Sequence, residues 1–521
     1  MRVLVIGLDG ATPQLLFPWA EEGKLPNLAN LIKEGVSGKL RSTIPPITAA
    51  AWVSFMTGKS PGKHGVVDFV QRKLGSYEIP EFNPVKSASE GKSGIDLSVI
   101  SAATIHTQKI WDILSENGKR VGVMHVPITY PPKKVNGFMI TGLGTPSPES
   151  NFTYPHKLRE KILGEGYKIH ITELDVENNE DAALRDMRDT EEKRCEIAIN
   201  LMREYNDWDF FFVMFEATDF IQHLFWKHTD PEHHAHEPEK AKKYGDAILG
   251  CYQLLDEQIG KIWENVDEKG TTVIIMSDHG GGPLNKLFYI NQWLMDLDLI
   301  KLKKERKKRI ALKLGLSEEN IRNMLITLGL KGIIKKIPGN IKGRMPKAYT
   351  SADFDWKKTK AYSVGGWGFI YLNLIGRERE GIVSGEEYQS LRNYIIEKLY
   401  KLKDPDTGEN VVKEVYKKED LYNGQPSDQL PDLILITDES MDCNHSITKE
   451  SSVLVPSFPK KSGNHRRDGI VIMKGKNIKK DLIIENAEII DIAPTILYLM
   501  GVPIPSDMDG KVLKDAFESS H

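Results

Sequence analysis

The chain has 521 residues, a formal net charge of −3, and 40% hydrophobic and 27% charged residues, as is usual for a globular protein. A chain of this length is too long to fold around one ordinary hydrophobic core. We therefore expect two or three domains, or one large α/β domain with insertions. The nearly neutral charge argues against a nucleic-acid-binding protein, which would normally be basic, so no specific nucleic-acid partner is predicted.

Three continuous apolar runs, at residues 2–9, 209–219 and 271–280, predict parallel strands buried on both faces. Helical patterns lie between them, at residues 26–35 and 247–266 for example. Strands alternating with helices imply right-handed crossovers and a doubly wound, mostly parallel α/β sheet with helices on both faces. The sequence also predicts strands at residues 120–127, 360–373, 430–437 and 468–475, a helix at 385–402, and a hairpin strand within 404–422.

Residues 301–347 differ from the rest of the chain, because they carry fifteen basic side chains and only three acidic ones. Spaced leucines and isoleucines predict helices there, so we expect a basic helical insertion in a catalytic domain formed by residues 1–300 and 348–521. Such a charge run is most often a solvated surface. The alternative is a rim that attracts an anionic substrate or an anionic lipid surface. The polar, turn-rich residues 71–107 and 147–188 are expected to form cap or loop elements.

Cysteine use and hydropathy predict a cytoplasmic protein. Cys195, Cys251 and Cys443 are scattered, so they form neither a metal-finger spacing nor a disulfide framework. The apolar start of the chain is too short for a signal peptide and is interrupted by Asp9. No run of 18 apolar residues occurs, so no transmembrane segment is expected.

Three aspartates, Asp9, Asp219 and Asp278, lie at the ends of the predicted strands, at the sheet edge where α/β proteins bind ligands. Converging carboxylates repel one another unless a cation lies between them. His223 follows Asp219 by four residues, on the same face of any helix that begins there, and His279 follows Asp278 directly. Alone, each motif is more often a turn or a helix cap. Together they favour two divalent metal ions, zinc or alternatively manganese, as used for in-line displacement at phosphorus.

Thr48 follows Pro45 and Pro46 and precedes a good helical run, so it is expected at a helix N-cap or in the first turn. The simplest interpretation is a capping residue. The functional interpretation is a hydroxyl at a helix N-terminus, where backbone N–H groups and the helix dipole favour a phosphate. Metal binding would lower the pKa of this hydroxyl and make it a nucleophile.

These motifs resemble the type I phosphodiesterase/nucleotide pyrophosphatase family of the alkaline phosphatase superfamily. The resemblance extends from residue 7 to residue 511, and it rests on LDG, MTGKSPGKHG, EATDFIQH, MSDHGGG, GNHRRDG and IIDIAPTILYLMGVPIPSDMDGK, in the family's order. It implies an alkaline phosphatase-like fold and hydrolysis of phosphodiesters or nucleotides through a phosphothreonine at Thr48. The alternatives are a phosphomonoesterase, a phospho-headgroup transferase, or an inactive binding protein on this scaffold.

The resemblance also implies the metal ligands. One metal would be held by Asp9, Asp278 and His279, with Thr48 as the reactive fourth ligand. The other would be held by Asp219, His223 and His465, of which His465 is assigned by the resemblance alone.

Asp68 and Phe69 stand where the family usually has an asparagine that binds a phosphoryl oxygen. Metals and backbone N–H groups near Ala49 would then hold that oxygen, and Asn285 and Lys286 are weaker candidates. Thr48 is followed by three alanines, which argues against sulfatase-type chemistry.

A further cluster of histidines, His228, His233, His234 and His236, is expected to lie in a loop and not to form a third metal site.

Overall fold

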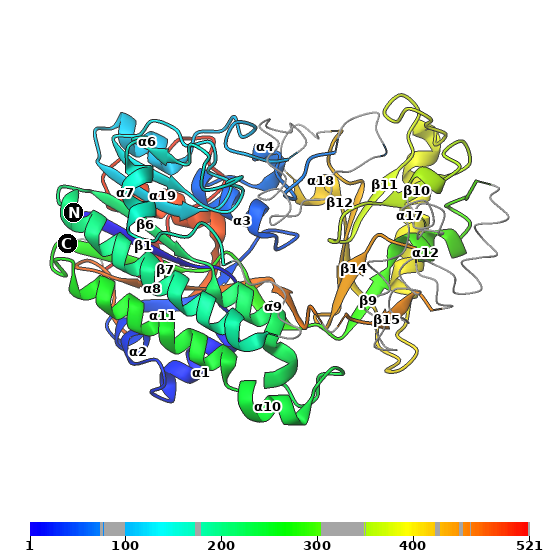
Figure 1. Ribbon diagram of the computed structural model, residues 1–521. Helices are drawn as coiled ribbons and strands as arrows, with labels where there is room; N and C mark the ends of the chain where they lie inside the picture. Colours follow the sequence, from blue (N-terminus) through cyan, green and yellow to red (C-terminus); the bar gives the residue numbers. More distant parts are fainter. Residues whose placement is uncertain are drawn as a thin grey trace.

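The computed structural model describes residues 1–72, 77, 99–171, 179–303, 349, 351–422, 428–447, 452–458 and 460–518. Its largest element is a nine-stranded mixed sheet (Figure 1). The strand order is β18 (Leu482–Glu488), β2 (Val36–Arg41), β17 (Asp468–Lys474), β7 (Thr271–Met276), β1 (Arg2–Leu8), β6 (Phe210–Phe215), β3 (Val121–Val126), β4 (Gly137–Thr141) and β5 (Thr153–Tyr154). Strands β17 and β5 run antiparallel to their neighbours, and the other pairs are parallel.

Helices cover both faces of this sheet, as the sequence predicts. The side chains of β1 alternate between two hydrophobic clusters, with Val3 and Val5 in one and Leu4, Ile6 and Leu8 in the other. The first cluster includes α3 (Thr48–Thr57), α6 (Ile110–Glu116) and α19 (Ile492–Leu499). The second includes α1 (Pro13–Glu21), α2 (Pro26–Lys33), α7 (Leu158–Gly164), α8 (Glu180–Glu204), α9 (Ala217–Thr229) and α11 (Ala247–Glu264).

Smaller sheets lie on the right in Figure 1. An antiparallel sheet contains β10 (Ala361–Ser363), β11 (Phe369–Leu372), β13 (Leu433–Thr437) and β12 (Val412–Lys417), and a second contains β14 (Met441–Asn444), β9 (Lys286–Tyr289) and β15 (Leu454–Pro456). The associated helices are α12 (Ile290–Asp296), α17 (Gly385–Tyr400) and α18 (Lys418–Leu421). Among the described residues, β8 (Gly280–Pro283) and β16 (Gly463–Arg466) form a two-stranded ribbon, and α4 (Pro61–His64) and α10 (Pro238–Tyr244) are short helices.

The predicted fold class is confirmed, but several element boundaries are different. The predicted strand 209–219 ends at Phe215, and Asp219 lies in the first turn of α9. Residues 360–373 form two short strands joined by a turn instead of one strand. Residues 280–282 begin β8, and a Cβ atom at these three glycines would collide with Asp468, Gln222 and Arg466.

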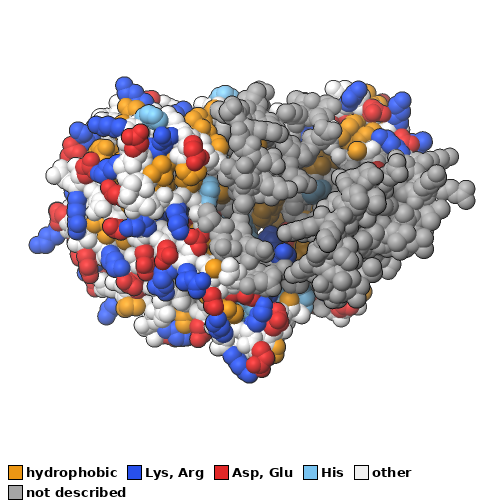
Figure 2. All heavy atoms as spheres, viewed as in Figure 1, with side chains coloured by type: hydrophobic (Ala, Val, Ile, Leu, Met, Phe, Trp, Pro, Cys, Tyr) orange, Lys and Arg blue, Asp and Glu red, His pale blue; other side chains and the backbone are white. Residues whose placement is uncertain are grey.

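The predicted insertion and cap segments are only partly described. Apart from residues 301–303, the basic segment 301–347 lies outside the described residues, as does most of 71–107. Segment 147–188 contains β5, which joins the large sheet, and the first turns of α8. Within the described part of the chain, none of the helices has the length and apolar character needed to span a bilayer. Acidic and basic side chains are interspersed over the large-sheet side of the molecule in Figure 2.

Candidate metal centre

Two groups of three side chains could each hold a metal ion. The first is Asp9, Asp278 and His279, and the second is Asp219, His223 and His465. Within each group the ligand atoms lie within 4.8 Å of one another. These six side chains, predicted from distant parts of the sequence, therefore come together at the carboxyl edge of the central strands.

The first group is fully buried and lies beside Thr48. Asp9 follows β1, and Asp278 and His279 link β7 to β8. The His279 Nε2 atom lies 3.4 Å from Asp9 Oδ1, 3.3 Å from Asp278 Oδ2, and 3.2 Å from Thr48 Oγ1. One imidazole nitrogen therefore faces two carboxylates and a hydroxyl, an arrangement that a bound cation would satisfy.

The second group combines two residues of α9 with one of β16. The Asp219 Oδ1 atom lies 3.2 Å from His223 Nε2 and 3.4 Å from His465 Nε2, and the two nitrogen atoms are 3.1 Å apart. The rings of His465 and His279 stack with their centroids 3.6 Å apart, so the two groups adjoin. The i to i+4 spacing on α9 brings Asp219 and His223 onto one face, as predicted.

Each of the three histidines is oriented by a backbone carbonyl. The Nδ1 atom lies 2.9 Å from the Gly280 oxygen in His279, 2.7 Å from the Gly463 oxygen in His223, and 2.8 Å from the Pro46 oxygen in His465. A carbonyl accepts only from N–H, so these contacts place the proton on Nδ1 and leave the Nε2 lone pair free. All three lone pairs then point into the centre, as in histidine ligands of protein metal sites.

The carboxylates of the first group lack partners for one oxygen each. Asp9 Oδ1 and Asp278 Oδ2 are buried without a hydrogen bond, while Trp52 Nε1 donates to Asp9 Oδ2 at 3.4 Å and the Gly10 N–H donates to Asp278 Oδ1 at 3.1 Å. Burial, together with the charges of Asp278 and Asp219, holds the pKa of Asp9 well above its ordinary value. Such orphaned buried oxygens fit a divalent cation well.

Asp219 differs from Asp9 and Asp278 in the direction of its pKa shift. Burial opposes the ionisation of Asp219, but the adjacent His223 and His465 outweigh burial and lower its pKa below the ordinary value. Burial raises the pKa of Asp278, and the nearby His279 acts in the opposite direction. The mixed carboxylate and imidazole donors of both groups suit zinc or manganese.

Thr48 is the first residue of α3, and every residue of this helix is buried. The helix packs so closely on β1 that a Cβ atom at Gly7 would lie 2.7 Å from the Trp52 ring. This contact fixes the N-terminus of α3 beside Asp9. Ala49 is the second helical residue, and amides at this end of a helix have no intrahelical acceptor.

The weaker sequence candidates have other partners. Lys286 Nζ lies 2.7 Å from both carboxylate oxygens of Asp404 and 2.6 Å from Asp406. The backbone of Asn285 bonds to Ser440 and Ser457, whereas its buried side-chain Oδ1 atom has no hydrogen-bond partner. Asp68 Oδ1 accepts from the Phe69 N–H at 2.7 Å, and burial raises the Asp68 pKa to about 7. None of these contacts is to a member of the two metal-ligand groups.

The histidine-rich stretch after α9 bonds mainly to backbone carbonyls. His233 Nε2 lies 3.0 Å from the Leu284 oxygen, His234 Nε2 lies 3.1 Å from the Ser457 oxygen, and His236 Nδ1 lies 2.8 Å from the Lys227 oxygen. Among the described residues, neither these histidines nor His228 belongs to a candidate metal group.

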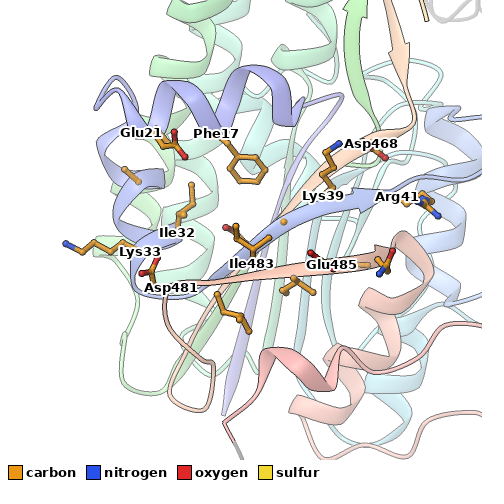
Figure 3. Close-up of a pocket in the computed structure, with 18 residues that line it drawn as sticks. Phe17, Glu21, Ile32, Lys33, Lys39, Arg41, Asp468, Asp481, Ile483 and Glu485 are labelled. Atoms are coloured by element: carbon orange, nitrogen blue, oxygen red, sulfur yellow. Dashed lines mark ion pairs between the residues drawn. The ribbon is translucent and has the colours of Figure 1, made fainter. Parts of the chain in front are cut away.

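A groove of about 790 Å³ lies at the β18 edge of the large sheet, between the strands and helices α1 and α2 (Figure 3). Its lining includes Phe17, Ile32 and Ile483, together with Lys39 and Asp468, which form an ion pair at 3.1 Å. None of the six candidate ligands lines this groove. It is therefore separate from the candidate metal centre.

Several contributors to the centre could not be recognised in the sequence. The carbonyls of Pro46, Gly280 and Gly463 carry no side-chain signal. Trp367 belongs to a turn of the smaller sheets, yet its ring lies 5.0 Å from the His465 ring. Two glycines on its N-terminal side and one after it mark a turn in the sequence, but they do not show what the turn contacts.

The central sheet, with the six side chains gathered at the carboxyl edge of its central strands, defines an alkaline phosphatase-like α/β protein. The model of the type I phosphodiesterase/nucleotide pyrophosphatase family matches residues 3–470. The chain belongs to this family of the alkaline phosphatase superfamily, which confirms the resemblance seen in the sequence. The comparison with curated proteins yields no match.

Solved structures share the fold at low sequence identity. Human ectonucleotide pyrophosphatase/phosphodiesterase 5 has 14% identity and a TM-score of 0.53, with 100% of both chains covered. Phosphonoacetate hydrolase from Sinorhizobium meliloti 1021, bound to phosphonoformate, has 14% identity and a TM-score of 0.57, covering 96% of this chain and 95% of that one. An inactive threonine-to-alanine variant of murine ectonucleotide pyrophosphatase/phosphodiesterase 5, bound to AMP, has 13% identity and a TM-score of 0.51, covering 99% of this chain and 100% of that one.

Proposed function

We propose that the protein is a two-metal phosphodiesterase, acting on phosphodiesters or nucleotide pyrophosphates through a phosphothreonine at Thr48. The observation that carries this proposal is the position of the Thr48 hydroxyl, 3.2 Å from the His279 Nε2 atom and beside the orphaned carboxylate oxygens of Asp9 and Asp278. The description of the murine threonine-to-alanine variant as inactive supports a catalytic threonine in a relative.

Different residues of the chain would bind the two metals, attack phosphorus and bind a phosphoryl oxygen. Asp9, Asp278 and His279 would hold one metal next to Thr48, and Asp219, His223 and His465 would hold the other. When bound, the metals supply positive charge for the phosphoryl oxygens and lower the pKa of the Thr48 hydroxyl. Thr48 Oγ1 attacks phosphorus, the leaving oxygen departs on the opposite side, and water then hydrolyses the phosphothreonine. The backbone N–H of Ala49 is available to a phosphoryl oxygen.

A diester is favoured over a monoester by the charges around the centre. Among the described residues, the close charged-group contacts of Asp9, Asp219 and Asp278 are all to histidines, and the ammonium of Lys461, on the His465 side of the centre, is already paired with Asp442. A phosphomonoester carries an additional negative charge, which calls for a further cationic side chain. The complete ligand set argues against an inactive binding protein. The headgroup-transferase alternative rests on residues 301–347 and gains no support from the described residues.

The proposal is tested by removing metals with EDTA and restoring them with Zn²⁺ or Mn²⁺. The reloaded protein is then assayed on bis(p-nitrophenyl) phosphate, p-nitrophenyl phosphate, p-nitrophenyl sulfate and a dinucleoside diphosphate. We expect activity to require metal and to favour the diesters. A fully loaded protein that hydrolyses none of them, or that prefers the monoester or the sulfate, would show that the proposal is wrong.

A further inference from the structure

Trp367 brings the smaller sheets into contact with the candidate metal centre. It lies in the turn between β10 and β11, and its ring centroid is 5.0 Å from that of His465, with an angle of 48° between the planes. The side chain is only partly buried. Trp367 therefore places a large, flat apolar surface next to a candidate metal ligand, where a substrate group could pack.

The turn that carries Trp367 has a fixed conformation. Gly365 and Gly368 have φ values of +79° and +74°, a region that favours glycine. The Leu435 N–H donates to the Gly368 oxygen at 3.0 Å, and His445 Nδ1 lies 3.0 Å from the Gly365 oxygen. A Cβ atom at Gly368 would lie 2.4 Å from the Leu435 oxygen. Because the turn is held by these contacts, a substrate group packing on Trp367 would not have to order it first.

A positive charge lies next to the same ring. Lys461 Nζ is 5.9 Å from the Trp367 ring centroid and donates to Asn464 Oδ1 at 2.9 Å. It also lies 3.3 Å from Asp442 Oδ2. The ammonium group supports the ring by a cation–π interaction and lies on the side of the centre that carries His465.

The position of Trp367 relative to Thr48 indicates which part of a substrate the Trp367 ring would contact. The Thr48 hydroxyl contacts His279, in the first ligand group, whereas Trp367 contacts His465, in the second. In phosphoryl transfer the attacking and leaving oxygens lie roughly in line, on opposite sides of phosphorus. A nucleophile at the first group therefore directs the leaving oxygen toward the second group and toward Trp367.

We propose that Trp367 is a specificity-determining residue that packs against a planar aromatic group on the leaving side of the substrate. This inference rests on the proposed function. The aromatic group belongs either to an aryl ester, directly on the leaving oxygen, or to the base of a nucleotide. Stacking of a base on an aromatic side chain contributes roughly tenfold or more to binding.

The test compares substrates whose leaving oxygens are matched. Di(adenosine-5′) diphosphate and P1,P2-diethyl diphosphate both release a phosphate monoester, but only the first carries an aromatic ring. Methyl p-nitrophenyl phosphate serves as the aryl ester. We compare wild type with Trp367→Leu, with Trp367→Phe, which keeps a flat ring, and with Trp19→Leu, which removes another partly buried indole from α1. Metal content and thermal unfolding midpoints are measured for each protein.

In Trp367→Leu we expect kcat/KM for the dinucleotide, relative to the diethyl compound, to fall about tenfold, mainly through KM. Trp367→Phe should retain most of this ratio, and Trp19→Leu should keep the wild-type value. A loss confined to the aryl ester would assign the ring to an aryl leaving group instead. If Trp367→Leu changes all substrates equally or none of them, the inference is wrong while the proposed function stands. If metal-loaded wild type hydrolyses no substrate, the proposed function fails and the inference fails with it.

Discussion

The His465 ring lies with its Nδ1 atom 2.8 Å from the carbonyl oxygen of Pro46, two residues before Thr48. This contact joins β16, near the end of the chain, to the turn that precedes α3. It directs Nε2 of His465 toward Asp219, and it fixes the backbone that presents the Thr48 hydroxyl. One hydrogen bond thus sets the position of the second ligand group relative to the candidate nucleophile.

We expect Thr48→Ala to lower diester hydrolysis about a thousandfold or more, because the attacking oxygen is lost, while bound metal remains largely unchanged. Steady-state rates and metal analysis check this. Thr57→Ala is the matched control, since its hydroxyl bonds only to the Val53 oxygen of the same buried helix, and its loss should cost about 1 kcal/mol of stability and little activity. Wild-type rates in Thr48→Ala would exclude Thr48 as the nucleophile.

His465→Ala should halve the metal content, because it removes a ligand from the second group and leaves the first intact. Metal bound per chain, measured after loading and desalting, is the readout. His234→Ala is the control, because His234 bonds to the Ser457 oxygen outside both groups. Equal metal content in the two variants would contradict the assignment of His465 as a ligand.

Metal loading should also raise the unfolding temperature of wild type, since a cation stabilises the buried carboxylates of Asp9 and Asp278.

Asp68 should make the protein less stable as the pH rises. Burial raises its pKa from 3.8 to about 7, so the folded state binds the proton more tightly than the unfolded state does. The stability contributed by protonated Asp68 is therefore full below about pH 4 and is lost as the pH rises to about 7. Asp68→Asn should equal wild type near pH 4 and exceed it above pH 8, by on the order of 1–2 kcal/mol because Asp68 is only partly buried. Parallel, pH-independent unfolding curves of the two proteins would refute this.

Arg194 should be important for stability, because it lies in an ion cluster in which Arg194 and Glu191 are fully buried and Glu216 is partly buried. It pairs with Glu191 and, at 3.2 Å, with Glu216, and Glu191 Oε1 accepts the backbone N–H groups of Glu216 and Ala217 at the start of α9. Removing the guanidinium leaves buried carboxylates unpaired, so Arg194→Met should cost about 3–5 kcal/mol. Arg188→Met, on the exposed side of the same helix, should cost less than about 0.5 kcal/mol. Denaturation midpoints measure both, and equal midpoints would contradict the role of the cluster.

The sequence predicts part of this centre, because buried strands have a clear hydrophobic pattern and end in polar residues. This pattern predicts the positions of Asp9 and Asp278. It places Asp219 at the end of a strand, whereas Asp219 lies in α9, because the apolar run of β6 passes into the apolar face of α9 without a break in the pattern. The assignments of all these ligands remain predictions, although the structure brings them together.

Other features depend on contacts between distant segments, which a single sequence does not reveal. His465 lies in β16, whose pairing with the glycines of β8 has no local signature, and its assignment needed the family resemblance. The glycines after His279 allow close approach of Gln222 and Arg466, a role that the sequence does not show. Trp367 reaches the centre only because the smaller sheets place its turn beside β16.

The insertion of β17 between β2 and β7 also has a consequence for biosynthesis. Strand β17 and the neighbouring β16 come from the last part of the chain, whereas β2 and Thr48 come from the first fifty-seven residues. A growing polypeptide carries Thr48 and five of the candidate ligands long before His465 leaves the ribosome. Until then, a gap remains in the middle of the sheet and the second ligand group is incomplete. Under the proposed function, activity on the ribosome should therefore begin only after β16 has emerged and paired with β8.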